Sequence, residues 1–176
     1  MALGTLIKRL KYFVFQITTF MENGQPIKES QIQVTTDLKA LEEVLEWFEQ
    51  FNLPIYLPSD LWWQYKIVIT EAFTNTVRHA HRGMPKDTPI DIDAKIFLNY
   101  VEMRIRDYGP PFDLEKKIEE LLRNPIPDPG NAEGGRGLLL MYQLTNDLRS
   151  IRVSEDRNCL IMGKKIRPLN KQQQLG

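Results

Sequence analysis

The sequence has little of the chemistry that builds disulfides or zinc sites, since its 176 residues include one cysteine and two histidines. A single cysteine permits no internal disulfide, and this cysteine with two histidines is too few ligands for a structural zinc cluster. We therefore expect Cys159 to be a small strand residue rather than a nucleophile, and a reducing, cytoplasmic setting.

The sequence also lacks an excess of either charge and a long apolar run. Lys+Arg and Asp+Glu number 23 each, so no global field favours nucleic acid or an anionic membrane. The apolar stretch at 12–20 follows basic residues, but polar residues interrupt it and no small-x-small cleavage site follows. It is shorter than the roughly 20 apolar residues of a membrane span. We expect no direct nucleic-acid partner and no membrane partner, and read this stretch as an extra strand or a partly apolar arm.

What is present suits one globular domain of ordinary composition, 42% hydrophobic and 26% charged. We expect a partly ordered N-terminal extension over 1–29, one domain over 30–168 and a polar tail over 169–176. Trp62 or Trp63 could present apolar surface to a partner, although burial of at least one of them in the core is the simpler expectation.

Apolar periodicity and turn residues divide this domain into helices and strands. A strand is predicted at 31–35, and a helix capped by Thr36 or Asp37 should continue to about 49–51. A second helix should begin with Ser59 as its cap and reach about Ala80. The remaining predictions are strands at 89–98 and 100–107, helices at 114–123 and 138–146, and a hairpin over 148–166. Helices interleaved with hairpins predict a two-layer α/β sandwich, with helices on one face of a mixed, mostly antiparallel sheet.

Polar side chains stand out on two of these elements. Glu71, Asn75 and His79 are spaced i, i+4 and i+8 in an otherwise apolar helix, so they share one stripe. Asp107 ends its strand on the same face as the apolar Val101, Met103 and Ile105, where a carboxylate needs a hydrogen-bond donor. Taken alone, the stripe could be a solvated helix face and Asp107-x-Gly109 could be only a turn.

The third polar element is the glycine-rich run at 134–137, which precedes a predicted helix. A flexible loop followed by a helix N-terminus can receive phosphate through backbone amides. The run lacks the Gly-Lys-Ser/Thr of a Walker loop and does not follow a strand as a dinucleotide fingerprint does. Alone, it is a weak signal.

The order of the three elements is more specific than any one of them. Glu-x-x-x-Asn on a helix, Asp-x-Gly after a strand and Gly-Gly-x-Gly before a helix resemble the ATP site of the GHKL superfamily. The words EAFTNTVRHA, RDYGPPFD and GGRGLLLMYQLTND resemble the anti-sigma-factor serine/threonine kinase family within it. The resemblance covers about residues 30–166 and implies the Bergerat, or histidine-kinase-like ATPase, fold.

The resemblance implies a role for each matching position, with ATP and Mg²⁺ as cofactors. Asn75 matches the magnesium ligand, Glu71 the general base for the attacking hydroxyl, and Asp107 the acceptor for the exocyclic amine of adenine. Gly109 lets the backbone approach the base. The remaining cofactor-binding positions lie at the end of the loop and are Gly135, Arg136, Gly137 and Leu138. Arg136 could reach the γ-phosphate or the partner, and His79 could pack or take part in the chemistry.

The resemblance also implies a function. We expect an ATP-dependent serine/threonine protein kinase that phosphorylates a STAS-domain anti-sigma antagonist in a partner-switching system controlling transcription. A sigma factor is a possible second partner, and a homodimer is the expected assembly. The alternative is a non-catalytic, nucleotide-responsive module that sequesters a sigma factor or another protein.

Overall fold

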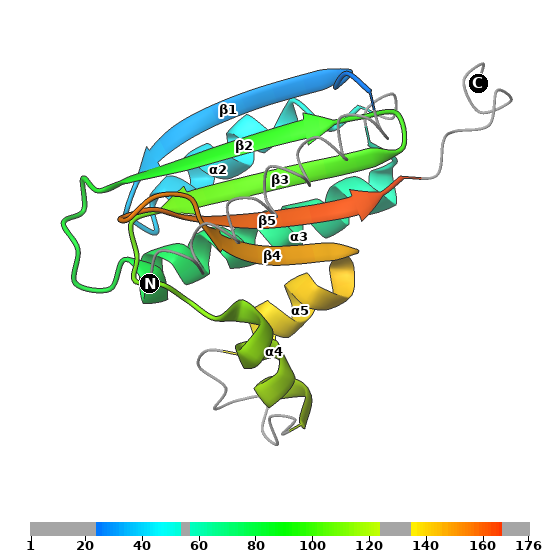
Figure 1. The fold of residues 1–176 in the computed structure, drawn as a ribbon. Helices are drawn as coiled ribbons and strands as arrows, with labels where there is room; N and C mark the ends of the chain where they lie inside the picture. Colours follow the sequence, from blue (N-terminus) through cyan, green and yellow to red (C-terminus); the bar gives the residue numbers. More distant parts are fainter. Residues whose placement is uncertain (1–23, 54–56, 124–134, 167–176) are drawn as a thin grey trace, which may run out of the picture.

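The structure is a computed structural model that describes residues 24–53, 57–123 and 135–166. Its sheet has the strand order β1-β2-β3-β5-β4, and every neighbouring pair runs antiparallel. The strands are β1 (Lys28–Thr35), β2 (Pro89–Ile96), β3 (Tyr100–Asp107), β4 (Asp147–Arg152) and β5 (Asn158–Lys165). β3 therefore lies at the centre of the sheet (Figure 1), and Asp107 is its last residue.

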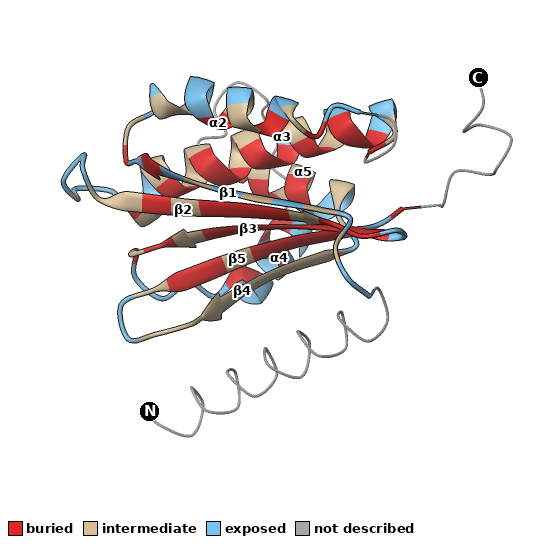
Figure 2. Cartoon of the chain, turned by 90° about the horizontal axis from the view of Figure 1, so that it is seen from above, coloured by how far each residue is buried: buried red, intermediate tan, exposed pale blue. Residues whose placement is uncertain are grey.

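Helices form the second layer. They are α2 (Ala40–Glu49), α3 (Ser59–Asn75), the π-helix η1 (Thr76–Ala80), α4 (Leu114–Arg123) and α5 (Arg136–Leu144). Figure 2 shows α2, α3 and α5 together on one side of the sheet. α3 contacts both α2 and α5, so it is the central helix of this layer. The predicted two-layer α/β sandwich with helices on one face is confirmed.

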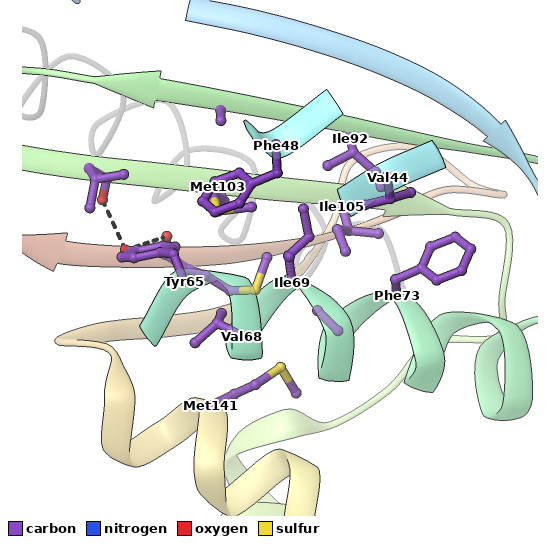
Figure 3. Close-up of a cluster of buried hydrophobic side chains, with 14 of the residues drawn as sticks. Val44, Phe48, Tyr65, Val68, Ile69, Phe73, Ile92, Met103, Ile105 and Met141 are labelled. Atoms are coloured by element: carbon purple, nitrogen blue, oxygen red, sulfur yellow. Dashed lines mark hydrogen bonds between the residues drawn. The ribbon is translucent and has the colours of Figure 1, made fainter. Parts of the chain in front are cut away.

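The core lies between the sheet and α2, α3 and α5, as Figure 3 shows. Val68, Ile69 and Phe73 of α3 are fully buried in one core cluster with Met103 and Ile105, which alternate on β3. The hydroxyl of Tyr65, also on α3, donates to the main-chain carbonyls of Val101 and Met162 at 3.3 and 3.4 Å. α3 is therefore held to the central strands by apolar packing and by a buried polar contact.

Helix boundaries differ from the predictions at three N-termini. α2 begins at Ala40, because Asp37 Oδ1 instead accepts a hydrogen bond from the Lys39 amide in a local turn. Ser59 is the first residue of α3 and Pro58 precedes it, so the predicted serine cap is wrong by one position. α5 begins at Arg136, two residues before the predicted start at 138.

The other expectations for the core are confirmed where the structure describes them. Trp62 is 4% exposed and stacks on Phe48, whereas Trp63 is 58% exposed. Cys159 is a buried strand residue of β5. No helix in the described residues is long and apolar enough to span a membrane. Most of the N-terminal extension and the whole of the polar tail lie outside the described residues.

Candidate functional site

A cavity of about 350 Å³ opens between α3, η1, α4 and α5, at the end of the sheet where β3 finishes. Its apolar wall is made by Ala72, Leu114, Leu138, Met141 and Leu160. Its polar lining is made by Asn75, Thr76, His79, Asp107, Lys117, Ser150 and Asn158. A mainly apolar cavity with a few convergent polar groups is the usual form of a small-molecule site.

Asp107 lies at the cavity wall and is 7% exposed. Its Oδ1 accepts hydrogen bonds from the Gly109 amide at 2.7 Å and from Asn158 Nδ2 at 2.9 Å. Within the described residues, Oδ2 accepts no hydrogen bond. The protein thus supplies part of the donor set that a buried carboxylate needs, and one oxygen remains an acceptor at the cavity.

Asn158 is the neighbour that fixes this carboxylate, and no local pattern in the sequence indicates it. The strand register places Asn158 of β5 between Asp107 of β3 and Arg152 of β4. Its Nδ2 also donates to the Gly109 carbonyl at 3.0 Å, while its Oδ1 accepts from Arg152 Nη1 at 2.8 Å. Arg152 donates to the Gly109 carbonyl as well, at 2.8 Å. This network holds the Asp107–Gly109 turn against the sheet.

His81 anchors the same turn from the other side. Its Nε2 accepts a hydrogen bond from the Tyr108 amide at 2.8 Å, so we assign the ring proton to Nδ1. Nδ1 lies 2.7 Å from Thr36 Oγ1, whose own proton goes to the Thr88 carbonyl. Burial lowers the pKa of His81 below its ordinary value, and the Asp107 carboxylate opposes this only partly. The buried ring is therefore neutral and joins the turn to Thr36, the residue that follows β1.

Gly109 is required by a close approach rather than by an unusual backbone angle. A Cβ at this position would lie 2.8 Å from both Ala80 Cβ and the Ala80 carbonyl, and 2.8 Å from Asp107 Oδ1. The turn after β3 therefore packs directly on the last residue of η1. This close approach is to Ala80, and the approach of the Gly109 backbone to an adenine base stays a prediction.

Glu71 and Gly137 meet where α3 faces the first turn of α5. A Cβ added to Gly137 would collide with the Glu71 carboxylate, whose Cδ would be 3.0 Å away. Glycine therefore leaves room for this carboxylate next to the N-terminal end of α5, where the helix dipole favours negative charge. Glu71 does not line the main cavity, but it lies one helical turn before Asn75, which does.

The stripe on α3 continues into a π-helix. The His81 amide bonds to the Thr76 carbonyl at 2.8 Å, five residues back, and Thr76, His79 and Ala80 all line the cavity. Single π-turns are rare and occur often at functional sites. His79 is exposed and reaches the cavity rim, whereas the buried histidine with defined partners is His81.

The described residues of the glycine-rich run lie at the start of α5. Gly135 precedes α5, Arg136 is the first helical residue and is exposed, and Leu138 is buried in the cavity wall. Gly134 lies outside the described residues. The N-terminus of α5 therefore lies next to Glu71 and the cavity. Backbone amides at such a helix N-terminus can bind an anion.

No cluster of three His, Cys, Asp or Glu side chains suited to a metal occurs in the described part of the chain. Of the oxygen donors at or near the cavity, the Asn75 amide and the Glu71 carboxylate lie one turn apart on α3, and the carboxylate is beside the first turn of α5. This sparse set suits Mg²⁺, which usually takes one or two protein ligands together with water and substrate phosphate oxygens.

An antiparallel sheet with helices on one face, and a cavity between the central helix and the end of the middle strand, define the class of GHKL-type ATPase domains. The family model for the histidine kinase-like ATPase domain matches residues 34–164, and the chain belongs to this family.

The chain is also similar to individual curated proteins. The chain is 36% identical over 88 residues to the serine-protein kinase RsbW of Listeria innocua, a match that covers 48% of this chain and 54% of that protein. For the RsbW of Bacillus subtilis the match is 33% over 88 residues, covering 48% and 53%. For that of Oceanobacillus iheyensis it is 32% over 102 residues, covering 57% and 62%. The chain spans little more than half the length of these relatives.

A solved structure also shares the fold. A chain of the SiaB–SiaC complex from Pseudomonas aeruginosa superimposes with a TM-score of 0.55, covering 89% of this chain and 99% of that chain. At 10% sequence identity, this likeness concerns the fold alone.

Proposed function

We propose that this protein is an ATP-dependent serine/threonine protein kinase that phosphorylates a STAS-domain anti-sigma antagonist. The observation that carries the proposal is the placement of Glu71 and Asn75, one turn apart on α3, between the cavity and the first turn of α5. The similarity to proteins named serine-protein kinase supports the reaction type.

Adenine would occupy the apolar part of the cavity. Asp107 Oδ2 would accept a hydrogen bond from the exocyclic amine, because Oδ1 is already engaged by Gly109 and Asn158. Leu138 and Met141 of α5 would pack on the ring. An apolar site with one fixed acceptor favours adenine over guanine, which presents a carbonyl oxygen at the same position.

The phosphates would lie toward the N-terminus of α5. The Asn75 amide oxygen would bind Mg²⁺, and the main chain at Gly135 and Gly137 would receive phosphate oxygens. When bound, the metal spreads the negative charge of the phosphates. Arg136 at the start of α5 and Lys117 in the cavity lining place positive charge near the same region.

Glu71 would act on the acceptor hydroxyl. Its carboxylate is held where Gly137 leaves space, and it would accept the proton of a serine or threonine hydroxyl. As the hydroxyl oxygen bonds to the γ-phosphorus, the bond from that phosphorus to the β–γ bridging oxygen would break and ADP would leave. Phosphoryl transfer depends chiefly on positioning and electrostatic stabilisation, so few protein groups are needed. The name of the relatives, serine-protein kinase, supports a protein side chain as the acceptor.

The test is transfer of the γ-phosphate of ATP to the STAS-domain protein that co-purifies with this chain. Wild type with Mg²⁺ should label a serine or threonine, and Glu71→Gln should reduce the rate about 10²–10⁴-fold with ATP binding retained. Glu120→Gln, an exposed carboxylate on α4, is the matched control and should transfer normally. Normal transfer by Glu71→Gln would remove the assigned base.

A second function is a nucleotide-responsive binding module that sequesters a sigma factor or another protein without catalysis. The exposed Trp63, with Leu38 and Ile67 also 40% or more exposed, offers apolar surface for such contacts. Binding of ATP and of the partner with no labelled hydroxyl amino acid would favour this module over the kinase. A homodimer is proposed for either function, and sedimentation of the full chain tests it.

A further inference from the structure

The turn after β3 is tied to the end of η1 by two neighbouring contacts. The Tyr108 amide donates to Nε2 of His81 at 2.8 Å. Gly109, the next residue, packs so closely on Ala80 that an added Cβ would lie 2.8 Å from the Ala80 Cβ. Asp107, the proposed acceptor for adenine, precedes Tyr108 in the chain, and its Oδ1 accepts from the Gly109 amide at 2.7 Å. The position of this carboxylate therefore depends on the bond between His81 and Tyr108.

The two ring nitrogens of His81 have opposite roles in this arrangement. Nδ1 lies 2.7 Å from Thr36 Oγ1, and the Thr36 hydroxyl donates to the Thr88 carbonyl at 2.7 Å, so the proton between them belongs to Nδ1. Nε2 is then the acceptor that the Tyr108 amide requires. A proton taken up by the ring can bind only at Nε2, where it would face the amide proton. Protonation therefore breaks the contact to the turn and keeps the contact to Thr36.

Asp107 is the charged group that acts on this ring. Burial lowers the pKa of His81, and the attraction of the Asp107 carboxylate opposes that effect. From the end of β1 the ring meets the Thr36 hydroxyl, which does not titrate. The charged side chains of Asp37 and Lys86, in the segments that join there, pair with each other at 3.0 Å. An imidazolium at His81 would thus attract the Asp107 carboxylate, which the exocyclic amine of adenine needs as its acceptor.

The remaining charged neighbours face away from the ring or into water. Tyr108 presents its amide to the ring, whereas its phenol ring lies 4.8 Å from the guanidinium carbon of Arg157. On the helix side, His79 and Arg82 are exposed, so water and salt screen their charges. The response of the turn to pH is therefore determined by the ring, by the amide that it binds and by the Asp107 carboxylate.

The neutral ring is the form that keeps the turn in place. The pKa of His81 in the folded protein lies below its ordinary value near 6.5. Above that ordinary value the ring is neutral and the turn is held, and the contact is lost as the pH falls through the folded-state value. A nucleotide that requires the held turn should lower this pKa further, because coupling between two sites is reciprocal.

We propose that His81 is a positioning residue for the nucleotide, because its Nε2 holds the Tyr108 amide, and that a proton at Nε2 releases the turn and weakens the binding of ATP. The inference rests on the proposed nucleotide site and adds regulation of that site by pH. The step is reversible, since the proton binds to a lone pair of the ring and no covalent bond of the protein breaks.

The test compares wild type with His81→Gln by calorimetric titration with Mg-ATP from pH 8 to pH 5. Glutamine places an amide oxygen where Nε2 lies, and this acceptor does not titrate in that range. Protonation of ATP itself affects both proteins alike and cancels in the ratio of their affinities. Wild type should lose at least about 5-fold more affinity than His81→Gln, as expected for a buried donor that loses its acceptor. Circular dichroism at each pH checks that both proteins are folded.

His79→Gln is the matched control, because it makes the same substitution at the exposed histidine. Its affinity should fall with pH as steeply as that of wild type, whatever its value at pH 8. His81→Leu removes the acceptor altogether and should bind ATP weakly at every pH. If this variant does not fold, the comparison of wild type with His81→Gln decides.

Nuclear magnetic resonance gives an independent readout. The chain has two histidines, so His79→Gln leaves His81 as the single imidazole whose pKa is followed. Saturating Mg-ATP should lower that pKa. A histidine that only stabilises the fold would keep the same pKa with and without nucleotide.

Two results would overturn the proposal. They are an equal loss of affinity in wild type and His81→Gln between pH 8 and pH 5, and a pKa of His81 that Mg-ATP leaves unchanged. Absence of ATP binding at pH 8 would refute the nucleotide site and this inference with it. Binding without phosphate transfer would refute the kinase activity alone, so failure of this inference and failure of the proposed function are distinguishable.

Discussion

Replacing Gly137 by alanine tests whether Glu71 is held in place by the first turn of α5. The added Cβ would overlap Glu71 Oε2, because the two atoms would be much closer than the 3.0 Å below which such atoms do not approach. The carboxylate therefore has to move away by roughly 1 Å to reach an allowed separation. The Glu71 side chain is flexible and half-buried, so the fold can absorb this movement. Alanine also stabilises a helix by up to about 1 kcal/mol relative to glycine. We expect the free energy of unfolding to change by less than about 1 kcal/mol.

Activity should respond very differently from stability. A misplacement of about 1 Å in a reacting group can cost roughly 10²-fold, so the rate of phosphate transfer should fall by about that factor. The affinity for ATP, measured by calorimetry, should change little, because the cavity wall at Asp107 is untouched.

A double-mutant cycle with Glu71→Ala isolates the contact. With alanine at position 71, the nearest atom from that residue is its Cβ at 3.6 Å, which is ordinary van der Waals contact. Gly137→Ala should then be more stabilising than in wild type and should cause no further loss of transfer. Additive effects on both stability and transfer would refute the contact as the reason for glycine at this position.

Further predictions concern the groups that support the site. Asn158→Ala should lower the free energy of unfolding by about 1–3 kcal/mol, because it removes a donor from buried Asp107; thermal melting measures this, and Glu155→Ala in the exposed turn is the control. The folded-state pKa of His81 is lowered, so its contribution to stability is full above the unfolded value near 6.5 and is lost as pH falls through the folded value. Between pH 7 and pH 5, the free energy of unfolding measured with denaturant should fall more steeply for wild type and His79→Gln than for His81→Gln. Equal pH dependence of this free energy in all three proteins would contradict a buried neutral ring at His81. Trp62→Ala removes a buried core side chain and should lower the free energy of unfolding by about 3–5 kcal/mol, whereas Trp63→Ala at an exposed position should change it little. Similar losses of unfolding free energy in the two variants would contradict the difference in burial.

The sequence predicts the elements well because their signals are local. The apolar spacing that predicts α3 and the alternation that predicts β3 depend only on residues a few positions apart. The structure confirms both elements. The resemblance to the kinase family then indicates the sandwich and the order of the three polar elements. The placement of Asp107 on the buried face of β3 follows from alternation alone and is also confirmed.

The supporting residues depend on long-range register, which the sequence does not display. Asn158 lies 51 positions from Asp107, and it becomes a neighbour only because β5 pairs with β3 in one particular register. His81 is joined to Thr36 across 45 positions, through the turn after η1. The π-helix that precedes it has no distinctive residue pattern. For these reasons the sequence pointed to His79, and the buried histidine with two defined partners went unnoticed.

The proposed kinase function requires ATP to bind in the cavity that Asp107 lines. Calorimetric titration of the full chain with Mg-ATP and Mg-GTP measures this binding. We predict that ATP binds at least about 100-fold more tightly than GTP, because Asp107 Oδ2 accepts from the adenine amine and repels the guanine carbonyl. Asp107→Asn should reduce this difference in affinity. Equal affinity for the two nucleotides, or no binding of ATP, would contradict this proposal.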